Sequence, residues 1–400
     1  MRFSMRLYKN ILWTVGSRYG SQALAVISNL LLARYLGSAG FGEYAFITAV
    51  VLIGNAFSTF GTDMILIRRI SSANDFSDLP AALVLQLSIS VVFILLAFVL
   101  APFLPVQRPL LIYVFALLPL SFFTIFTTIL RGVQQMDGFS IMHFASALTH
   151  LLAVLLLLGM RGSVAQLAFY LLCVHVIGAA LGFFLCRGFL EKWIFAPRRI
   201  PALIKSSVRM ALIGTLRLLY EKITLTILPV LTTVSETGLF ASSARTVDAA
   251  KLGHLSALTA IYPEMARTKL AGAHLNRSGL WLFAAAVMIA LILFLFAEPI
   301  LLLLFGREFS SSASALRILA WTVIPYYVVS YYSLAFVAVE REMTVLSALG
   351  FAFLILVALL VWLVPLYGLR GAAGSILIAE IVQAALLWLH WRRYVRANPA

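Results

Sequence analysis

Acidic residues are scarce in this chain of 400 residues, which has 15 Asp and Glu against 30 Lys and Arg. Charged residues of both signs make up only 11% of the sequence, whereas hydrophobic residues make up 62% and the mean hydropathy is +1.02. These proportions exclude an ordinary soluble domain. Apolar runs such as 83–100 and 280–296 approach the length that crosses a bilayer core about 30 Å thick. The sequence therefore predicts an all-α polytopic membrane protein.

Other absences exclude whole classes of chemistry. Cys173 and Cys186, the two cysteines, lie thirteen residues apart in one predicted helix, so they cannot bridge each other and are predicted to be reduced packing residues. The six histidines show no metal-ligand spacing, and no Gly-rich loop with a Lys is present to hold a nucleotide phosphate. We therefore expect no metal, no cofactor and no ATP hydrolysis.

The placement of basic residues predicts a topology. About twelve spans are expected, at 10–33, 41–61, 81–104, 109–130, 140–160, 164–186, 207–230, 237–262, 279–304, 312–338, 343–365 and 371–391. One set of alternating connections, with the termini, holds 18 Lys and Arg, and the other set holds 5. The positive-inside rule then places both termini in the cytoplasm of a multi-pass protein of the cell inner membrane. Since topology explains most of the charge, membrane lipids rather than nucleic acid are the expected partners.

The chain also contains an internal repeat. Gly42-Glu-Tyr-Ala45 in the first half and Gly238-Leu-Phe-Ala241 in the second share a Gly-x-aromatic-Ala pattern at an offset of 196 residues. We expect an N-terminal six-helix lobe over 1–186, a cytoplasmic linker over 187–206, and a C-terminal six-helix lobe with a short tail over 207–400. Because six is even, the lobes are predicted to be parallel repeats around a central cavity.

Seven basic residues fall inside these apolar stretches, where each costs roughly 2.5–3.5 kcal/mol if it faces lipid. Arg209 and Arg317 lie near span ends and can snorkel to the surface. The other five, with two polar neighbours on the first span, point to a cationic cavity that binds an anion. The candidate binding residues are Arg18, Gln22, Asn29, Arg217, Lys222, Arg245 and Lys251.

The alternative interpretation is that the charges pair with each other and only hold helices together. Glu221 follows Arg217 by four residues and Asp248 follows Arg245 by three, which are spacings that allow pairing. These two acids cannot neutralise all five cations, so we expect a surplus of about three positive charges. Glu221 and Asp248 are also the candidate sites for a coupling proton or sodium ion. The aromatic cluster of 321–332 is predicted to be structural, although its rings could also stack on sugars.

The first connection resembles a known family. Its sequence Arg34-Tyr-Leu-Gly37-Ser-Ala-Gly-Phe-Gly42-Glu-Tyr44, followed by Phe60-Gly61 and Arg68-Arg69-Ile-Ser71, is similar to the opening of Wzx-type oligosaccharide-lipid flippases, with Ser38 in place of the usual proline. These proteins belong to the multidrug/oligosaccharidyl-lipid/polysaccharide exporter superfamily. The twelve-span, two-lobe plan agrees with that family over the whole chain.

The resemblance implies a transporter, not an enzyme. Its expected cargo is an undecaprenyl-pyrophosphate-linked oligosaccharide of the O-antigen, lipopolysaccharide, capsule or exopolysaccharide type, with other polysaccharide-assembly proteins as candidate partners. Related lipid II flippases have cavity arginines on their first and eighth helices, and Arg18 and Arg245 are the comparable positions here.

Three rival functions have different requirements. A drug or cation antiporter of the same superfamily needs an acidic cavity, whereas the first span offers Arg18 and no acid. A membrane-embedded glycan polymerase or ligase needs a large extracytoplasmic loop, which the short connections do not provide. A non-transporting lipid-binding scaffold is compatible with the sequence.

Overall fold

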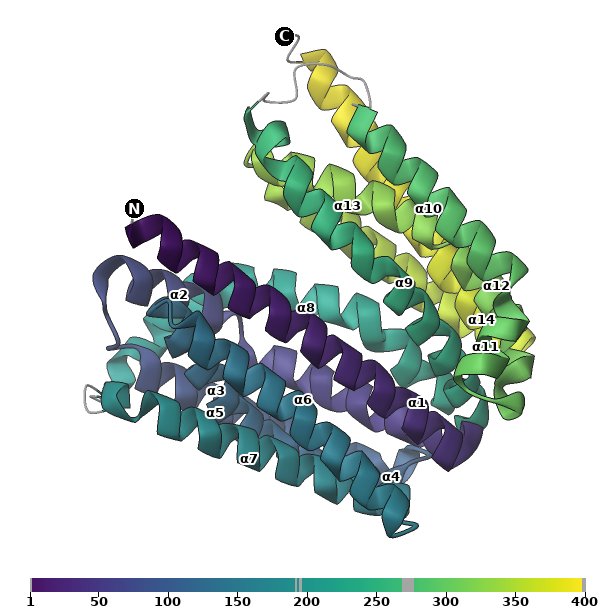
Figure 1. Ribbon diagram of the computed structural model, residues 1–400, viewed down its shortest axis with the longest axis horizontal. Helices are drawn as coiled ribbons and strands as arrows, with labels where there is room; N and C mark the ends of the chain where they lie inside the picture. The colour runs from purple at the N-terminus through teal and green to yellow at the C-terminus, as the bar shows by residue number, and fades with distance from the viewer. Residues whose placement is uncertain (1, 191–192, 194–195, 268–276, 398–400) are drawn as a thin grey trace. The chain divides into compact units, whose positions relative to one another are not determined.

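The computed structural model describes residues 2–190, 193, 196–267 and 277–397, and helices make up nearly all of this part of the chain (Figure 1). No β-strand occurs among the described residues. The expected all-α fold is confirmed. Two compact units can be distinguished, one formed by Met1–Leu36 with Glu43–Lys222 and the other by Gly37–Gly42 with Ile223–Ala400. The predicted lobes at 1–186 and 207–400 stay a prediction.

Two of the helices are double. Helix α1 (Arg2–Thr59) contains a non-helical residue at Gly37, with φ 68° and ψ −173°, and α14 (Glu342–Ala397) contains one at Gly368, with φ 56° and ψ −133°. Residues with a Cβ rarely adopt such positive φ angles, so glycine permits the chain to turn here. Each long helix is therefore a pair of arms joined at a glycine, as two spans with a short connection require.

The first unit contains the first arm of α1, most of its second arm, and the following helices. They are α2 (Thr62–Ala73), α3 (Leu79–Leu100), α4 (Gln107–Tyr113), α5 (Leu117–Gly132), α6 (Met136–Gly159), α7 (Val164–Leu190) and α8 (Ile200–Leu231) as far as Lys222. Helix α5 packs against α2, α3, α6 and α7. A buried cluster including Leu66, Ile125, Phe126 and Met142 forms the core, with Cys186 in it as a free thiol. The prediction of unbridged cysteines is confirmed.

The second unit contains the remaining helices. They are α9 (Val234–Arg267), α10 (Arg277–Leu295), α11 (Ala297–Leu304), α12 (Ala313–Ala320), α13 (Val323–Ala338) and α14. Helices α10 and α11 meet at a bend of 74°, and the segments 307–320 and 323–338 meet at 40°. The predicted spans 279–304 and 312–338 are therefore broken rather than continuous. Helix α14 packs against α9, α12 and α13.

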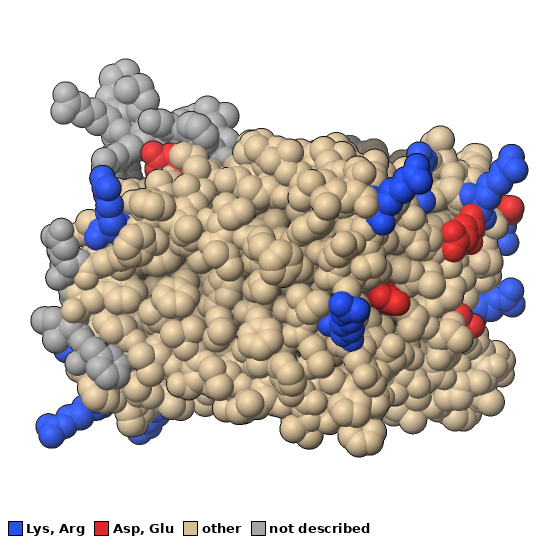
Figure 2. All heavy atoms as spheres, turned by 90° about the horizontal axis from the view of Figure 1, so that it is seen from below, with Lys and Arg blue, Asp and Glu red and all other residues tan. Residues whose placement is uncertain are grey.

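The helices are suited to a bilayer. Among the described residues, six helices are long and apolar enough to cross a membrane, or eight if each bent pair is one span. Of these, α1 and α14 contain two arms each. Helices α8 and α9 are not among them: they are long enough to cross a membrane but carry several charged residues. Counted in this way, the helices account for the twelve predicted spans. Figure 2 shows a face with a broad band free of Lys, Arg, Asp and Glu, and charged residues lie on both sides of this band. The protein is a multi-pass membrane protein.

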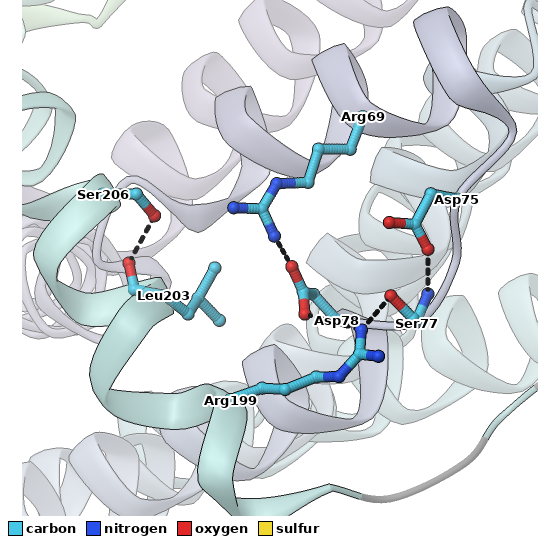
Figure 3. Close-up of polar contacts among 7 residues, drawn as sticks. All are labelled: Arg69, Asp75, Ser77, Asp78, Arg199, Leu203 and Ser206. Atoms are coloured by element: carbon cyan, nitrogen blue, oxygen red, sulfur yellow. Dashed lines mark hydrogen bonds and ion pairs between the residues drawn. The ribbon is translucent and has the colours of Figure 1, made fainter.

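The connection before α8 is fastened to the first unit by one aspartate (Figure 3). Asp78, at the start of α3 and 5% exposed, pairs with Arg69 of α2 and, at 3.3 Å, with Arg199 from the turn before α8. Arg199 also donates to the Ser77 hydroxyl, and the Ser77 amide donates to Asp75 at 2.9 Å. The predicted cytoplasmic connections 62–80 and 187–206 therefore meet at the same end of this unit.

The repeated glycines lie in contact within the second unit. A Cβ on Gly42 would lie 1.9 Å from the carbonyl oxygen of Val234, and a Cβ on Gly238 would lie 1.9 Å from that of Ser38. The two glycines are 196 residues apart, and so are Ser38 and Val234, whose carbonyl oxygens they approach. Beside them the hydroxyls of Ser38 and Ser235 are 2.7 Å apart. Two repeat-related turns thus cross with their backbones touching, which only glycine allows. This reciprocal contact supports the internal repeat.

Candidate functional site

Helix α1 presents part of its predicted polar stripe on an exposed face. Arg18 and Gln22 are exposed, and they lie one turn apart. Gly20, nearly opposite to them around the helix, faces Phe144 of α6 and so marks the side that packs into the first unit. Asn29, further along, is half-buried, and its amide donates to the carbonyl of Ala25 at 2.8 Å. Arg18 is therefore held on a packed helix with its charge directed away from the unit's core.

Helix α8 carries the predicted ion pair of Arg217 and Glu221, which is confirmed at 3.4 Å between Nε and Oε1. The two side chains are 71% and 47% exposed. Exposed pairs of this spacing contribute only about 0.3–0.5 kcal/mol, and both partners belong to one helix. The pair therefore cannot be what holds helices together. Lys222, the last residue of the first unit, is half-buried beside it.

Helix α9 brings Arg245 and Asp248 to the second unit. The Arg245 guanidinium lies over the Phe41 ring, 4.6 Å from its centroid, and Phe41 packs in turn against Phe305 and Phe309. A cation above an aromatic face is attracted by the ring quadrupole, so this contact orients the guanidinium. Asp248, three residues further on, is exposed. The predicted pairing of Arg245 with Asp248 stays a prediction.

Lys251 has a partner that the sequence analysis missed. Its Nζ lies 3.4 Å from Oε1 of Glu380, on the second arm of α14, and 4.3 Å from the ring centroid of Tyr326 on α13. Three helices thus meet at one buried ion pair. The signal was present in the sequence, because Glu380 is an acid inside the otherwise apolar span 371–391. An acidic residue inside a span indicates a functional site as readily as a basic residue does.

Glu380 changes the predicted charge balance. The predicted balance sets only Glu221 and Asp248 against the five cations Arg18, Arg217, Lys222, Arg245 and Lys251, and Glu380 is a further acid inside a predicted span. The expected surplus of positive charge stays a prediction. Six of the predicted site residues belong to the first unit and three to the second. The first set is Arg18, Gln22, Asn29, Arg217, Glu221 and Lys222, and the second is Arg245, Asp248 and Lys251.

Aromatic and histidine side chains near these helices serve packing. Tyr331 and Tyr332 are buried in a cluster with Trp391 and Phe336, as predicted for a structural role, whereas Tyr326 faces the Lys251 ammonium. The His175 ring bonds the Tyr113 hydroxyl at 3.0 Å. Among the residues that the structure describes, no group of His, Cys, Asp and Glu could hold a metal ion.

The fold and these charged helices define a class, that of multi-pass membrane proteins built from two helical units. The family model described as "Polysaccharide biosynthesis protein" matches residues 7–269, about two thirds of the sequence, and the chain belongs to this family. No curated protein sequence matches it.

Solved structures with the same fold are transporters. An inward-closed structure of the lipid II flippase MurJ superposes with a TM-score of 0.77 at 15% identity, covering 96% of this chain and 87% of that one. An inward-facing multidrug resistance transporter of the MATE family gives 0.74 at 15% identity, covering 94% and 95%. A Pyrococcus furiosus transporter of the MOP superfamily, described as having a binding pocket of reversed polarity, gives 0.66 at 16% identity, covering 97% and 96%. At these identities the likeness establishes the fold.

Proposed function

We propose that this protein is a flippase that moves an undecaprenyl-pyrophosphate-linked oligosaccharide across the cytoplasmic membrane. The cargo is a repeat unit of O-antigen, capsule or exopolysaccharide. Transport occurs by alternating access of two lobes around a central cationic cavity, and the chain itself performs no covalent chemistry. The protein lies in the cell inner membrane with both termini in the cytoplasm.

The surplus of positive charge on membrane helices is the observation that carries this proposal. The predicted interior stretches of α1, α8, α9 and α14 carry five cations and fewer acids. A pyrophosphate that joins a lipid to a sugar has one negative charge on each phosphate, so an anionic headgroup of this kind suits a surplus of positive charge. Membership of the polysaccharide biosynthesis family points to the same kind of cargo.

Arg18, Arg217 and Arg245 are the residues proposed to contact the pyrophosphate, with Lys222 and Lys251 as further cations and Gln22 and Asn29 as hydrogen-bonding neighbours. Arginine suits this role because its planar guanidinium can bind two phosphate oxygens at once. The aromatic support beneath Arg245 reduces the entropy lost when an anion binds.

The test is transport of a fluorescent undecaprenyl-pyrophosphate oligosaccharide in vesicles containing the purified protein. Each charged hydrogen bond to phosphate contributes roughly 1.5–3 kcal/mol, so Arg18→Ala, Arg217→Ala and Arg245→Ala should each slow flipping about tenfold or more. Lys at these positions should restore part of the rate. Arg209→Ala is the matched control, because Arg209 is exposed near a span end and should leave transport unchanged. Wild-type rates in all three alanine variants would rule out the assignment.

Glu221 and Asp248 are proposed to take up the coupling proton or sodium ion, since both are exposed on the charged helices. Glu221→Gln and Asp248→Asn should then keep the protein folded while flipping no longer depends on the ion gradient. If the confirmed pair of Glu221 and Arg217 is only structural, Glu221→Gln should instead lower the stability slightly, by about 0.3–0.5 kcal/mol, and leave gradient dependence intact. Melting temperature and gradient dependence, measured on the same samples, separate these two results.

A further inference from the structure

Glu380 is a buried carboxylate that makes one ion pair among the residues that the structure describes. It is 7% exposed, and its Oε1 lies 3.4 Å from Lys251. Its other oxygen, Oε2, is buried and has no hydrogen-bond partner among the residues that the structure describes. A buried acceptor without a partner is costly, and more so when it belongs to a charged group.

A comparison within the same chain shows how incomplete this pairing is. Asp78, another buried acid, is contacted by two arginines. Glu380 instead shares a single ammonium, and that ammonium also lies over the Tyr326 ring. The free energy lost when an ion pair leaves water is recovered only when the pair has good geometry and its remaining polar atoms make further hydrogen bonds. A proton on Glu380 would remove the charge that lacks full compensation.

The charged and titratable groups around Glu380 are few. Helix α9 contributes Lys251 and also Asp248, whose charge acts on Glu380. Helix α13 contributes Tyr326, through its contact with Lys251. Helix α12 also packs on α14, but its one charged residue, Arg317, is exposed, and no ion pair or hydrogen bond joins it to Glu380 among the described residues. Lys251 is thus the cation whose position depends on the charge of Glu380.

From this arrangement we propose that Glu380 is a proton-binding site, and that Lys251 alternates between Glu380 and the anionic headgroup of the cargo. When Glu380 is ionised, Lys251 is held by it. When Glu380 takes a proton from water it becomes a neutral acid, and the Lys251 ammonium, still charged, is released to a phosphate oxygen. Headgroup binding therefore takes up about one proton. The inference rests on the proposed function, because it assumes a pyrophosphate cargo.

The experiment measures binding to the purified full chain in detergent micelles, between about pH 5.5 and pH 8. The ligand is an undecaprenyl-pyrophosphate-linked sugar, whose two phosphates each keep one negative charge over this range. Calorimetry in buffers of different ionisation enthalpy gives the number of protons taken up. The wild-type affinity should rise about tenfold as the pH falls, with net proton uptake. Glu380→Gln should bind with the wild-type low-pH affinity at every pH and take up no proton. Lys251→Met should bind weakly throughout.

Two further variants keep the test decisive. Removing one partner of a buried pair can destabilise a protein, so the double variant Lys251→Met/Glu380→Gln, which leaves no buried charge at the pair, should fold and bind as weakly as Lys251→Met. Glu298→Gln makes the same acid-to-amide change at an exposed residue of α11 and should retain the wild-type pH dependence.

The possible failures are distinguishable. If Glu380→Gln keeps the wild-type pH dependence and proton uptake, the proton site is elsewhere and the inference is overturned, while the proposed function stands. If sodium at constant pH changes the wild-type affinity and pH does not, the site binds a metal cation and the proton assignment is wrong. If the wild-type protein binds no undecaprenyl-pyrophosphate-linked sugar at any pH, the proposed function fails and the inference fails with it.

Discussion

Individual glycines decide where this backbone can turn and where two helices can touch. Gly42 and Gly238 have no space for a side chain, because the atoms that a Cβ would meet are backbone carbonyl oxygens, which cannot rotate away. Gly374, on the second arm of α14, has no other atom within 4 Å of the corresponding position. Glycines in one chain thus range from indispensable to replaceable.

Gly42→Ala is therefore expected to destabilise the protein strongly. The new Cβ would stand 1.9 Å from the Val234 oxygen and force the two turns apart, at a cost of about 1–3 kcal/mol or more. Gly374→Ala is the control and should be neutral or stabilising by up to about 1 kcal/mol, because alanine favours a helix interior. The melting temperatures of both variants can be measured by heating the protein and monitoring its loss from the folded peak by fluorescence-detected size-exclusion chromatography. An unchanged melting temperature in Gly42→Ala would contradict the close crossing.

At the scale of helices, two carboxylates lie against the glycine turns of the double helices. Glu308 accepts a hydrogen bond from the Ser38 amide at 2.6 Å, directly after Gly37. Glu236 occupies the equivalent place at Gly368, where a Cβ would stand 2.8 Å from its Oε2. Because the Ser38 backbone and side chain both bond to Glu308, the pKa of that carboxyl is lowered from its ordinary value. The ionised form of Glu308 therefore stabilises the turn of α1.

This contact should make stability depend on pH in a defined direction. A carboxyl whose pKa is lower in the folded state contributes stability above its unfolded pKa of about 4.3, and this contribution is lost as the pH falls through the folded value. Glu308→Gln should thus melt below wild type at neutral pH, and the difference should shrink below about pH 4. Glu308→Asp, with a shorter reach, should lose part of the contact. A difference that is constant with pH would show that ionisation is irrelevant.

The Asp78 contacts predict a second effect on stability. Asp78→Asn removes the charge that both Arg69 and Arg199 contact, and should cost about 1–3 kcal/mol. It should also release the turn before α8, so that trypsin cleaves after Arg199 faster than in the wild type. Asp75→Asn is the control, since exposed Asp75 bonds only Ser77 among the described residues and should change little. Equal cleavage rates in the three proteins would refute an anchoring role for Asp78.

Much of this element-scale structure could be predicted from the sequence, and the exceptions have physical reasons. Hydropathy and charge place the spans, since every residue in a span contributes to that signal. The bend at Phe296 and the helix α2 depend on local packing and leave no comparable pattern in composition. The Arg217–Glu221 pair was predictable because helix geometry fixes its spacing. The Lys251–Glu380 pair spans 129 residues, and only the folded chain brings it together.

For the molecule as a whole, contacts within each unit agree with the topology predicted from charge. In the first unit, Arg69, Asp78 and Arg199 join two connections of the basic-rich set. Among connections of the basic-poor set, the Tyr35 hydroxyl donates to the Gly162 carbonyl at 3.1 Å. In the second unit, the hydrogen bond from the Ser38 amide to Glu308 joins connection 34–40 to connection 305–311, which also belongs to the basic-poor set. Neither kind of contact mixes the two sets.

This agreement yields a test of orientation with two single-cysteine proteins in a background where Cys173 and Cys186 are replaced by Ala. Ser72→Cys and Ser163→Cys lie at exposed positions in connections of the basic-rich and basic-poor sets, respectively. If the basic-rich side is cytoplasmic, a membrane-impermeant maleimide should label the cysteine at 163 in intact cells and the cysteine at 72 only in inside-out vesicles. The reverse pattern would invert the proposed topology. The twelve-span plan places three spans, an odd number, between residues 72 and 163. If both cysteines were labelled from the same side, an even number of spans would separate them and the plan would be wrong.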